Sequence, residues 1–366
     1  MILYDPHCDD NIFTPVSYYI GRRTALKKYE YIKSAMVNNG GLKIYFSYKN
    51  SSLPNVIIKK IPNIFLRWIV LAEIFIWRYI NNIDSSCVIN EIDGHDVFCF
   101  GYKKFNNITH DEVNSSKTFN IHLTHYHTYG YNSIYLEPNV NLLYDTDVSH
   151  HLYFMSKFIG YTRKVIVMPF YVKDRFFTVP LASGKRHGVS ITGTYHDICP
   201  FECDFGIYNN NRVTLHPIRH ELATTKRRLS ERFHTRLSLY VNPNNFITLL
   251  SRLRGYSQSK YFSFDIADFY SRTKISLVAG EGTGAVAIGA LESLAAGCIP
   301  LLKSSEVQGL DLPPDAYLIY ENIEDILNFS EFDTNVEPAF LRNVALRFSF
   351  INSTLRFESY IRGQLG

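Results

Sequence analysis

The stretch KISLVAGEGTGAVAIGALESLAAGCIPLL, which runs from Lys274 to Leu302, decides the fold class of this chain. It contains a short apolar run with β-branched residues, three closely spaced glycines, a run of helix-forming residues and a second apolar run. Glycine lets the backbone turn sharply, and Gly297 is suited to end a helix. The stretch therefore predicts a strand, a glycine-rich turn, a helix over 285–296 and a second strand, as in a parallel sheet covered by helices.

The remainder of the chain repeats this alternation of strands and helices. LKIYFSY at 42–48, DVFCFGY at 96–102 and TFNIHLT at 118–124 predict further strands, and AYLIY at 316–320 predicts one after the glycine-rich stretch. Helix-forming segments separate these apolar runs. The pattern predicts an α/β protein with parallel sheets.

The chain has 366 residues, a length that favours two domains. A polar, glycine-containing stretch near the middle marks the boundary. We expect a domain over 1–175, a second over 188–335, and a helical tail over 336–366 that can cross back to the first domain.

Composition excludes several classes of protein. Hydrophobic residues make up 46% of the chain, which excludes a disordered protein. The net charge of +4 is too mild for a dedicated nucleic-acid binder, yet it allows an anionic substrate. Six cysteines are scattered along the chain, and the N-terminal residues lack the pattern of a signal peptide. We therefore expect reduced thiols and a cytoplasmic protein.

The segment IFLRWIVLAEIFIWRYI at 64–80 is the most apolar part of the chain. Its three charged residues disfavour a helix that spans a membrane. The pattern favours a well-buried amphipathic helix. The alternative is peripheral contact of Trp68 and Trp77 with the inner face of a membrane.

The glycines of the opening stretch are suited to bind phosphate. A glycine turn at the start of a helix presents backbone N–H groups and a partial positive charge. The residues from Gly282 to Ala287 nearly match the dinucleotide fingerprint G-x-G-x-x-G/A. That fingerprint normally opens a dinucleotide-binding domain, whereas here it lies near the C-terminal end. A dinucleotide-dependent oxidoreductase is therefore the weakest of the alternatives.

The residues around the glycines carry a more specific resemblance. Tyr270-Ser271, the glycine turn, Glu292, Gly297-Cys-Ile-Pro300 and Leu312-Pro313 occur in an order that resembles the donor-domain signature of exostosin-like glycosyltransferases. The similarity covers roughly residues 265–327. It implies the GT-B architecture, in which two Rossmann-like domains with parallel sheets face each other across a cleft.

The resemblance also implies roles for residues of the second domain. Glu292 would accept hydrogen bonds from hydroxyls of the ribose or the donor sugar, and the glycine turn would hold the diphosphate. The alternative for Glu292 is a solvated helix residue. The predicted donor-binding residues are Gly193, Thr194, Arg219, Gly280, Glu281, Gly282, Thr283, Gly284 and Glu292. Many retaining GT-B enzymes carry a closely spaced pair of glutamates here, which Glu281 and Glu292 do not resemble, so retention and inversion both stay open.

A departing nucleoside diphosphate needs positive charge, and the sequence contains no obvious metal site. Arginine and lysine can supply that charge without a metal. We favour Arg219 because it follows an apolar run and a proline turn, whereas a solvated surface charge is the alternative for each cation. The other candidates are Lys185, Arg186, Lys226 and Arg227. No cofactor is predicted, and the enzyme is expected to be independent of metal.

The first half contains a group of polar residues that can act on an acceptor. On a strand, His125 and His127 share one face and His122 points to the other. If the reaction inverts, a general base must accept the proton of the acceptor hydroxyl. The predicted catalytic residues are His125, His127 and Asp145, with His7 as a further candidate; the alternatives are a structural histidine cluster and a chance metal site.

These observations predict a GT-B glycosyltransferase that transfers a sugar from an activated, phosphate-bearing donor, expected to be a sugar nucleotide. The acceptor would be a glycan or a lipid-linked oligosaccharide in surface polysaccharide biosynthesis. The alternative from another class is a non-catalytic module of the same fold that binds a nucleotide or glycan. The sequence leaves the donor sugar and the acceptor open.

Overall fold

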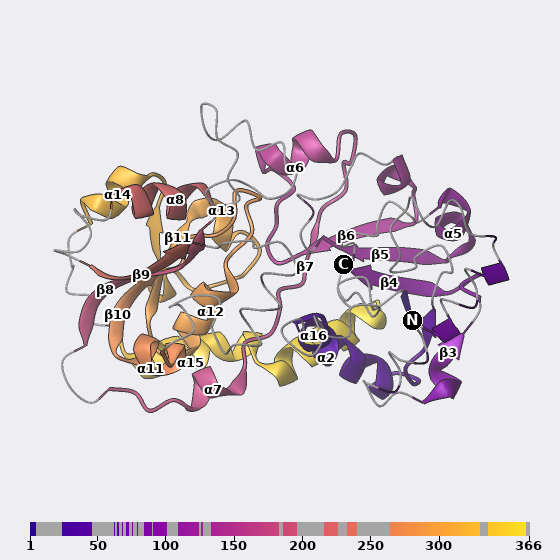
Figure 1. Cartoon of the computed structure of the whole chain (residues 1–366), viewed down its shortest axis with the longest axis horizontal. Helices are drawn as coiled ribbons and strands as arrows, with labels where there is room; N and C mark the ends of the chain where they lie inside the picture. Colours follow the sequence, from indigo (N-terminus) through magenta and orange to yellow (C-terminus); the bar gives the residue numbers. More distant parts are fainter. Residues whose placement is uncertain are drawn as a thin grey trace. The chain divides into compact units, whose positions relative to one another are not determined.

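The fold is described from a computed structural model of the whole chain (Figure 1). The structure describes residues 1–4, 24–45, 84–89, 91–100, 109–123, 126, 133–182, 186–195, 216–225, 233–239, 264–329 and 336–363, together with Pro62, Ile64, Phe65, Trp68, Leu71, Ala72, Phe75 and Tyr79.

The chain divides into two compact units, which we call unit 1 and unit 2. Unit 1 comprises Met1–Tyr144, Phe158–Met168 and Thr354–Gly366, and unit 2 comprises Asp145–Lys157 and Pro169–Ser353. The division differs from the predicted domain ranges, because residues 145–157 and 169–175 belong to unit 2 and the predicted tail is divided, with 336–353 in unit 2 and 354–366 in unit 1.

Unit 1 contains a parallel sheet of seven strands in the order β3-β2-β1-β4-β5-β6-β7. The strands are β1 (Ile2–Tyr4), β2 (Ile44–Tyr45), β3 (Val88–Ile89), β4 (Asp96–Phe100), β5 (Thr118–His122), β6 (Val140–Tyr144) and β7 (Ile166–Val167). The order 3-2-1-4-5-6 is that of a Rossmann sheet. The parallel α/β architecture predicted from the sequence is therefore confirmed for this unit.

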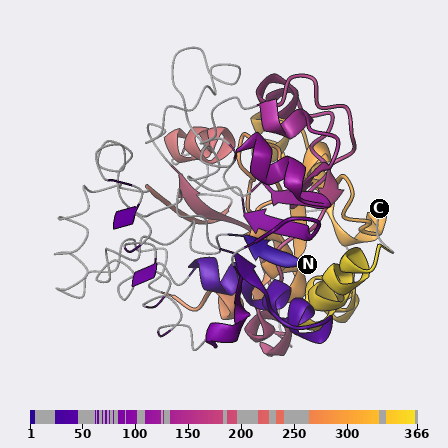
Figure 2. The ribbon, with the colours of Figure 1, turned by 90° about the vertical axis from the view of Figure 1, so that its right-hand side faces the viewer.

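Helix α16 (Phe350–Ile361), which begins in unit 2, packs on the sheet of unit 1 and on α2 (Thr24–Asn38) through aromatic residues. Further helical elements are η1 (Ser85–Cys87), α5 (His110–Ser115) and η4 (Ser133–Leu136). Phe357 of α16 contacts Phe98 of β4 and Tyr31 of α2, with ring centroids 5.0 and 6.2 Å apart. Figures 1 and 2 show α16 and α2 close together beside this sheet. The C-terminal helix thus supplies part of the core of unit 1.

Unit 2 contains a second parallel sheet, in the order β12-β11-β10-β8-β9. Its strands are β8 (His187–Tyr195), β9 (His234–Leu239), β10 (Thr273–Leu277), β11 (Ile299–Lys303) and β12 (Leu318–Tyr320). Its helical elements are α6 (Leu152–Lys157), α7 (Asp174–Thr178), α8 (Pro217–Thr224), α11 (Ile266–Ser271), α12 (Ile288–Ala295), α13 (Ser304–Val307), η6 (Pro314–Ala316), α14 (Ile323–Leu327), α15 (Pro338–Ala345) and η7 (Leu346–Phe348).

The glycine-rich stretch folds as its sequence predicts, into β10, a turn, α12 and β11. Apolar side chains of both strands are buried, and α12 begins three residues later than predicted. The chain leaves α12 through Gly297, whose φ of +83° suits glycine.

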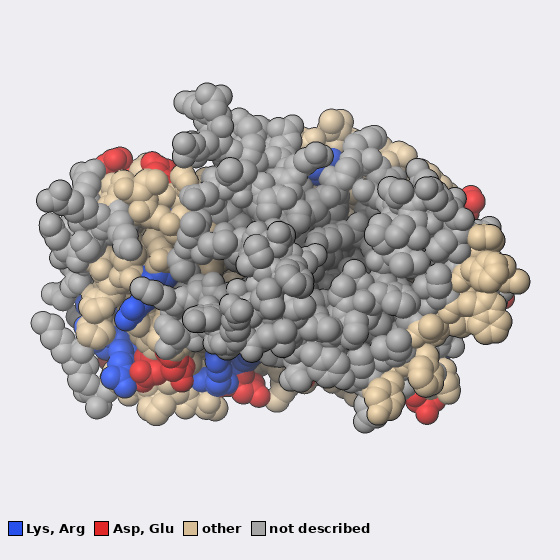
Figure 3. All heavy atoms as spheres, viewed as in Figure 1, with Lys and Arg blue, Asp and Glu red and all other residues tan. Residues whose placement is uncertain are grey.

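On the surface of this unit, basic and acidic side chains are interspersed near α11 (Figure 3), where Arg272 pairs with Asp268 at 2.9 Å.

The apolar segment at 64–80 differs from its expected burial. Every described residue from Ile64 to Tyr79 is helical and exposed, including Trp68 and Phe75. Most positions of the segment are apolar, so the sequence pattern could not tell which of them face solvent. Trp77 lies outside the described residues. Among the described helices, none is long and apolar enough to span a bilayer.

Candidate active site in unit 2

The glycine turn of unit 2 follows the carboxyl end of β10, where ligands bind to open parallel sheets. The backbone N–H of Gly284 donates to the carbonyl of Glu281 at 3.1 Å, and Gly284 has a φ of +86°. A Cβ atom on Gly280 would collide with the carbonyl oxygen of Ala285 and with Oε1 of Glu306. Two of the three glycines are therefore required by the shape of this turn.

A buried carboxylate holds the start of the turn. Oε1 of Glu306 accepts a hydrogen bond from the backbone N–H of Gly280 at 2.7 Å, and Oε2 accepts one from the N–H of Lys303 at 3.1 Å. Burial raises the pKa of Glu306 to about 7, and these two N–H groups and the nearby charges of Lys303 and Arg219 act in the opposite direction. Glu306 thus ties the end of β10 to the end of β11.

Arg219 also holds the backbone at the start of the glycine turn. It is buried in α8, where its Nε donates to the carbonyl of Ala279 at 2.6 Å and its Nη1 donates to the carbonyl of Thr194 at 3.0 Å. Gly193 has a φ of +140°, and a Cβ atom there would lie 3.0 Å from Cδ and Nε of Arg219. The absence of a side chain at Gly193 therefore makes room for the arginine.

The structure thus brings together four of the predicted donor-binding residues, Gly193, Thr194, Arg219 and Gly280, at the carboxyl ends of β8 and β10. The two hydrogen bonds described for Arg219 go to carbonyl oxygens and fix the backbone. Its predicted contact with a leaving phosphate stays a prediction.

Glu292 lies one helical turn inside α12, the helix that the glycine turn opens. Its side chain is half-buried. Burial raises its pKa to about 7, while the positive charges of Lys173 and Arg175 lower it. These two cations lie just before and within α7, which packs against α12. Glu292 is therefore a carboxyl group that changes charge near neutral pH beside two cations.

A loop that precedes α6 lies against the glycine turn. The hydroxyl of Thr146 donates to the carbonyl of Gly284 at 3.2 Å. The ring of His151 covers the same residue, because a Cβ atom on Gly284 would lie 2.6 Å from its Cδ2. Burial and the charge of Lys303 lower the pKa of His151, which favours the neutral imidazole. Asp145, predicted as catalytic, precedes Thr146 in this loop.

Among the described residues of the chain, no group of three or more His, Cys, Asp or Glu side chains is arranged to hold a metal ion.

Comparisons with known proteins bear on the fold. No family model matches the chain, and no curated protein matches it. The crystal structure of a glycosyltransferase from Rickettsia africae ESF-5 matches 99% of this chain and 98% of its own length, with 11% identity and a TM-score of 0.51. The chain has the GT-B fold.

Further GT-B structures match with lower TM-scores. The pneumococcal O-GlcNAc transferase GtfA in complex with UDP and GlcNAc shares 11% identity over 74% of this chain, with a TM-score of 0.40. AviGT4, a glycosyltransferase involved in avilamycin A biosynthesis, shares 10% identity over 91% of this chain and 88% of its own, also with a TM-score of 0.40. The chain spans 57% of the GtfA chain and 58% of the chain matched in the GtfA/B complex.

The GT-B fold confirms the fold class predicted from the sequence.

Several other predicted residues lie outside the described part of the chain, so their roles stay predictions. They are His7, His125, His127, Lys185, Lys226 and Arg227.

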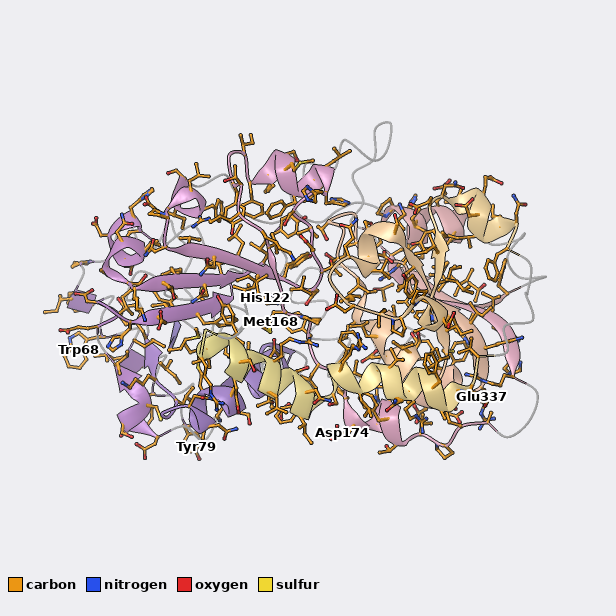
Figure 4. The ribbon with its side chains drawn as sticks, turned by 180° about the vertical axis from the view of Figure 1, so that it is seen from behind. Trp68, Tyr79, His122, Met168, Asp174 and Glu337 are labelled. Carbon is orange, nitrogen blue, oxygen red and sulfur yellow. The ribbon has the colours of Figure 1, made fainter. Side chains whose placement is uncertain are left out.

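Two more residues have structural partners, His122 of the histidine-rich segment and the candidate Arg186. His122 is fully buried in β5, and its Nε2 lies 3.0 Å from the carbonyl oxygen of Met168 (Figure 4). Arg186 donates through Nη2 to the carbonyl of Gly297 at 2.6 Å. Both contacts hold backbone within their own units.

Tyr320 allows a first test of the buried group around Glu306. Its side chain is 2% exposed, and its hydroxyl has no hydrogen-bond partner within the described residues. Burial and the nearby charge of Glu306 raise its pKa. Because a buried hydroxyl without a partner carries a desolvation cost, we expect Tyr320→Phe to stabilise the protein by about 1 kcal/mol. Calorimetry would measure the shift in melting temperature. A lower melting temperature for the variant would contradict the finding that the Tyr320 hydroxyl has no partner among the described residues.

Proposed function

We propose that this chain is a glycosyltransferase that transfers a sugar from a sugar nucleotide to a hydroxyl of an acceptor. The observation that carries the proposal is the glycine turn at the carboxyl end of β10, fixed from two sides by Glu306 and Arg219. A rigid turn can present backbone N–H groups to a diphosphate without further ordering. The fold of the chain resembles that of a glycosyltransferase over nearly the whole length of the chain, and this likeness supports the proposal.

In this proposal, the acceptor hydroxyl attacks the anomeric carbon of the donor sugar. The bond to the nucleoside diphosphate breaks, and the diphosphate leaves with the electron pair. The N–H groups of the turn and nearby cations stabilise its charge, and Lys173, Arg175 and Lys303 are candidates beside Arg219. If the reaction inverts, His125, His127 or Asp145 accepts the proton of the hydroxyl.

The finer parts of the proposal rest on the sequence. The order of motifs over 265–327 favours an exostosin-like enzyme. A lipid-linked oligosaccharide at the inner face of a membrane would suit a role in surface polysaccharide synthesis. We propose no cofactor and no metal, because the cations named above can serve the leaving group.

Glu292 provides the direct test. If its carboxylate accepts hydrogen bonds from donor hydroxyls, Glu292→Gln should lower kcat/KM by about 10- to 100-fold, since a hydrogen bond to a charged group is worth about 1.5–3 kcal/mol. In the unmodified protein, kcat/KM should rise with pH through about 7, where the folded carboxyl loses its proton, and the variant should lose this rise. A panel of sugar nucleotides, screened first by thermal shift, would supply the donor.

The matched control is Glu324→Gln, an exposed glutamate on α14 of the same unit. It should leave both kcat/KM and its pH profile unchanged. Turnover of Glu292→Gln equal to that of the unmodified protein would remove Glu292 from the site. Sugar-nucleotide binding without transfer to any acceptor would favour a non-catalytic module, and a change in NADH fluorescence would favour an oxidoreductase.

A further inference from the structure

Unit 1 exposes an unusually apolar helix face, outside the proposed active site. It consists of Ile64, Phe65, Trp68, Leu71, Ala72, Phe75 and Tyr79, and we call it the apolar face. These residues are helical and follow one another at spacings of mostly three and four, so they line one side of the helix. The Tyr79 hydroxyl and the Trp68 indole N–H are the polar side-chain groups among them.

The aromatic members of the apolar face are directed into solvent. Trp68 and Phe75 are each 67% exposed, and Tyr79 is 82% exposed. Figure 4 shows Trp68 and Tyr79 at the outer edge of the unit 1 ribbon, on the side away from His122 and Met168. Scattered apolar residues are normal on a protein surface, whereas a continuous stripe of large side chains marks an interaction site.

The chemistry of the segment identifies a partner. Trp and Tyr favour the boundary between water and lipid, where an apolar ring and a polar group are both accommodated. Within residues 59–80, Lys59, Lys60, Arg67 and Arg78 outnumber the single acidic residue, Glu73. Basic residues beside an apolar helix face are typical of helices that lie in the plane of an anionic membrane surface.

We propose that the apolar face inserts into the surface of a bilayer that contains anionic lipids, so that unit 1 is held at the membrane. The helix would lie parallel to the surface, with Trp68, Leu71 and Phe75 among the acyl chains and Tyr79 near the headgroups. Insertion needs neither sugar donor nor turnover, so it can be tested independently of the proposed activity.

Sedimentation with lipid vesicles would test the proposal. The full chain should sediment with vesicles of phosphatidylcholine and phosphatidylglycerol, and much less with phosphatidylcholine alone. Replacing two large apolar side chains, in Trp68→Ser/Phe75→Ser, should lower the partition coefficient by about tenfold or more. The matched control is Ile159→Ser, a residue of unit 1 that is 65% exposed but lies outside the apolar face, and it should bind as the unmodified protein does.

Fluorescence provides a second measurement that does not depend on the folding of the double variant. The chain has two tryptophans, so Trp77→Phe leaves Trp68 as the reporter. Its emission should shift to shorter wavelength when anionic vesicles are added. Emission that stays unchanged, or equal sedimentation of the double variant, would overturn the proposal. A dimer that the double variant dissociates, without vesicle binding by the unmodified chain, would assign the apolar face to a second copy instead.

Discussion

Gly280→Ala is expected to abolish transfer and to destabilise unit 2 by about 3 kcal/mol. A Cβ atom at this position would collide with the carbonyl oxygen of Ala285 and with Oε1 of Glu306. Neither neighbour can retreat easily. The carbonyl belongs to the backbone of the same loop, and the carboxylate is buried and bonded to the N–H of Lys303 at its other oxygen. The turn would have to open, and the N–H of Gly280 would then lose its hydrogen bond to Glu306.

Gly94→Ala is the control for this substitution. Gly94 has a φ of +69° but no neighbour within 4 Å of the added Cβ atom, so alanine there costs about 1 kcal/mol of backbone strain without a collision. Calorimetry would measure stability, thermal shift would measure donor binding, and a transfer assay would measure activity. Gly280→Ala with the activity and melting temperature of the unmodified protein would refute the tight packing of the turn.

The sequence predicted the parts of this architecture that depend on neighbours in the chain. Apolar runs marked β4, β5, β10, β11 and β12, and the glycines marked the turn, because strand periodicity and glycine conformation are local properties. Pro217, which was interpreted as a turn, instead begins α8, the helix that carries Arg219. Local patterns were therefore enough for the fold class.

Contacts between distant residues could not be predicted in this way. Glu306 binds a backbone N–H that lies 26 residues earlier, and Arg219 binds a carbonyl 60 residues later. His151 and Lys173 reach the site from parts of the chain that the sequence pattern assigned to the first domain. Each of these contacts depends on strand order and on loop paths, which no local spacing encodes. The exposure of the described residues from Ile64 to Tyr79 could not be predicted for a related reason, since most positions of the segment are apolar and burial depends on distant neighbours.

Arg219 lies beside the glycine turn, while its predicted contact with a phosphate stays a prediction. The sequence indicated a cation near the phosphate, and the structure places Arg219 beside the glycine turn. Its described hydrogen bonds, however, go to the carbonyls of Thr194 and Ala279. A guanidinium with several donors in a fixed plane is well suited to join two strand ends. Arg219 therefore fixes the backbone of the turn and carries a positive charge beside it.

Glu306→Ala is expected to be the most destabilising substitution near the site, by about 3–5 kcal/mol. It would leave the N–H groups of Gly280 and Lys303 without their acceptor. Glu324→Ala, at an exposed position on α14, serves as the control and should change stability little. Equal melting temperatures for the two variants would show that Glu306 does not hold the turn.

The same carboxyl group should make stability depend on pH in a particular direction. Folded Glu306 keeps its proton up to about pH 7, whereas an ordinary glutamate loses it near 4.5. Between these values the folded chain binds more protons than the unfolded chain, so stability should fall as pH rises from about 4.5 to about 7, by about 3 kcal/mol for this group. Glu292 contributes in the same direction.

Glu306→Gln cannot titrate, so its melting temperature should fall less steeply over this range than that of the unmodified protein, and Glu292→Gln/Glu306→Gln should flatten the slope further. Calorimetry at several pH values would measure the slopes. A slope that is unchanged in both variants would mean that the folded carboxyl groups titrate at their ordinary pKa. Glu306 binds the backbone of the turn, whereas Glu292 is proposed to bind hydroxyls of the donor. We therefore expect only Glu292→Gln to remove the rise of kcat/KM with pH.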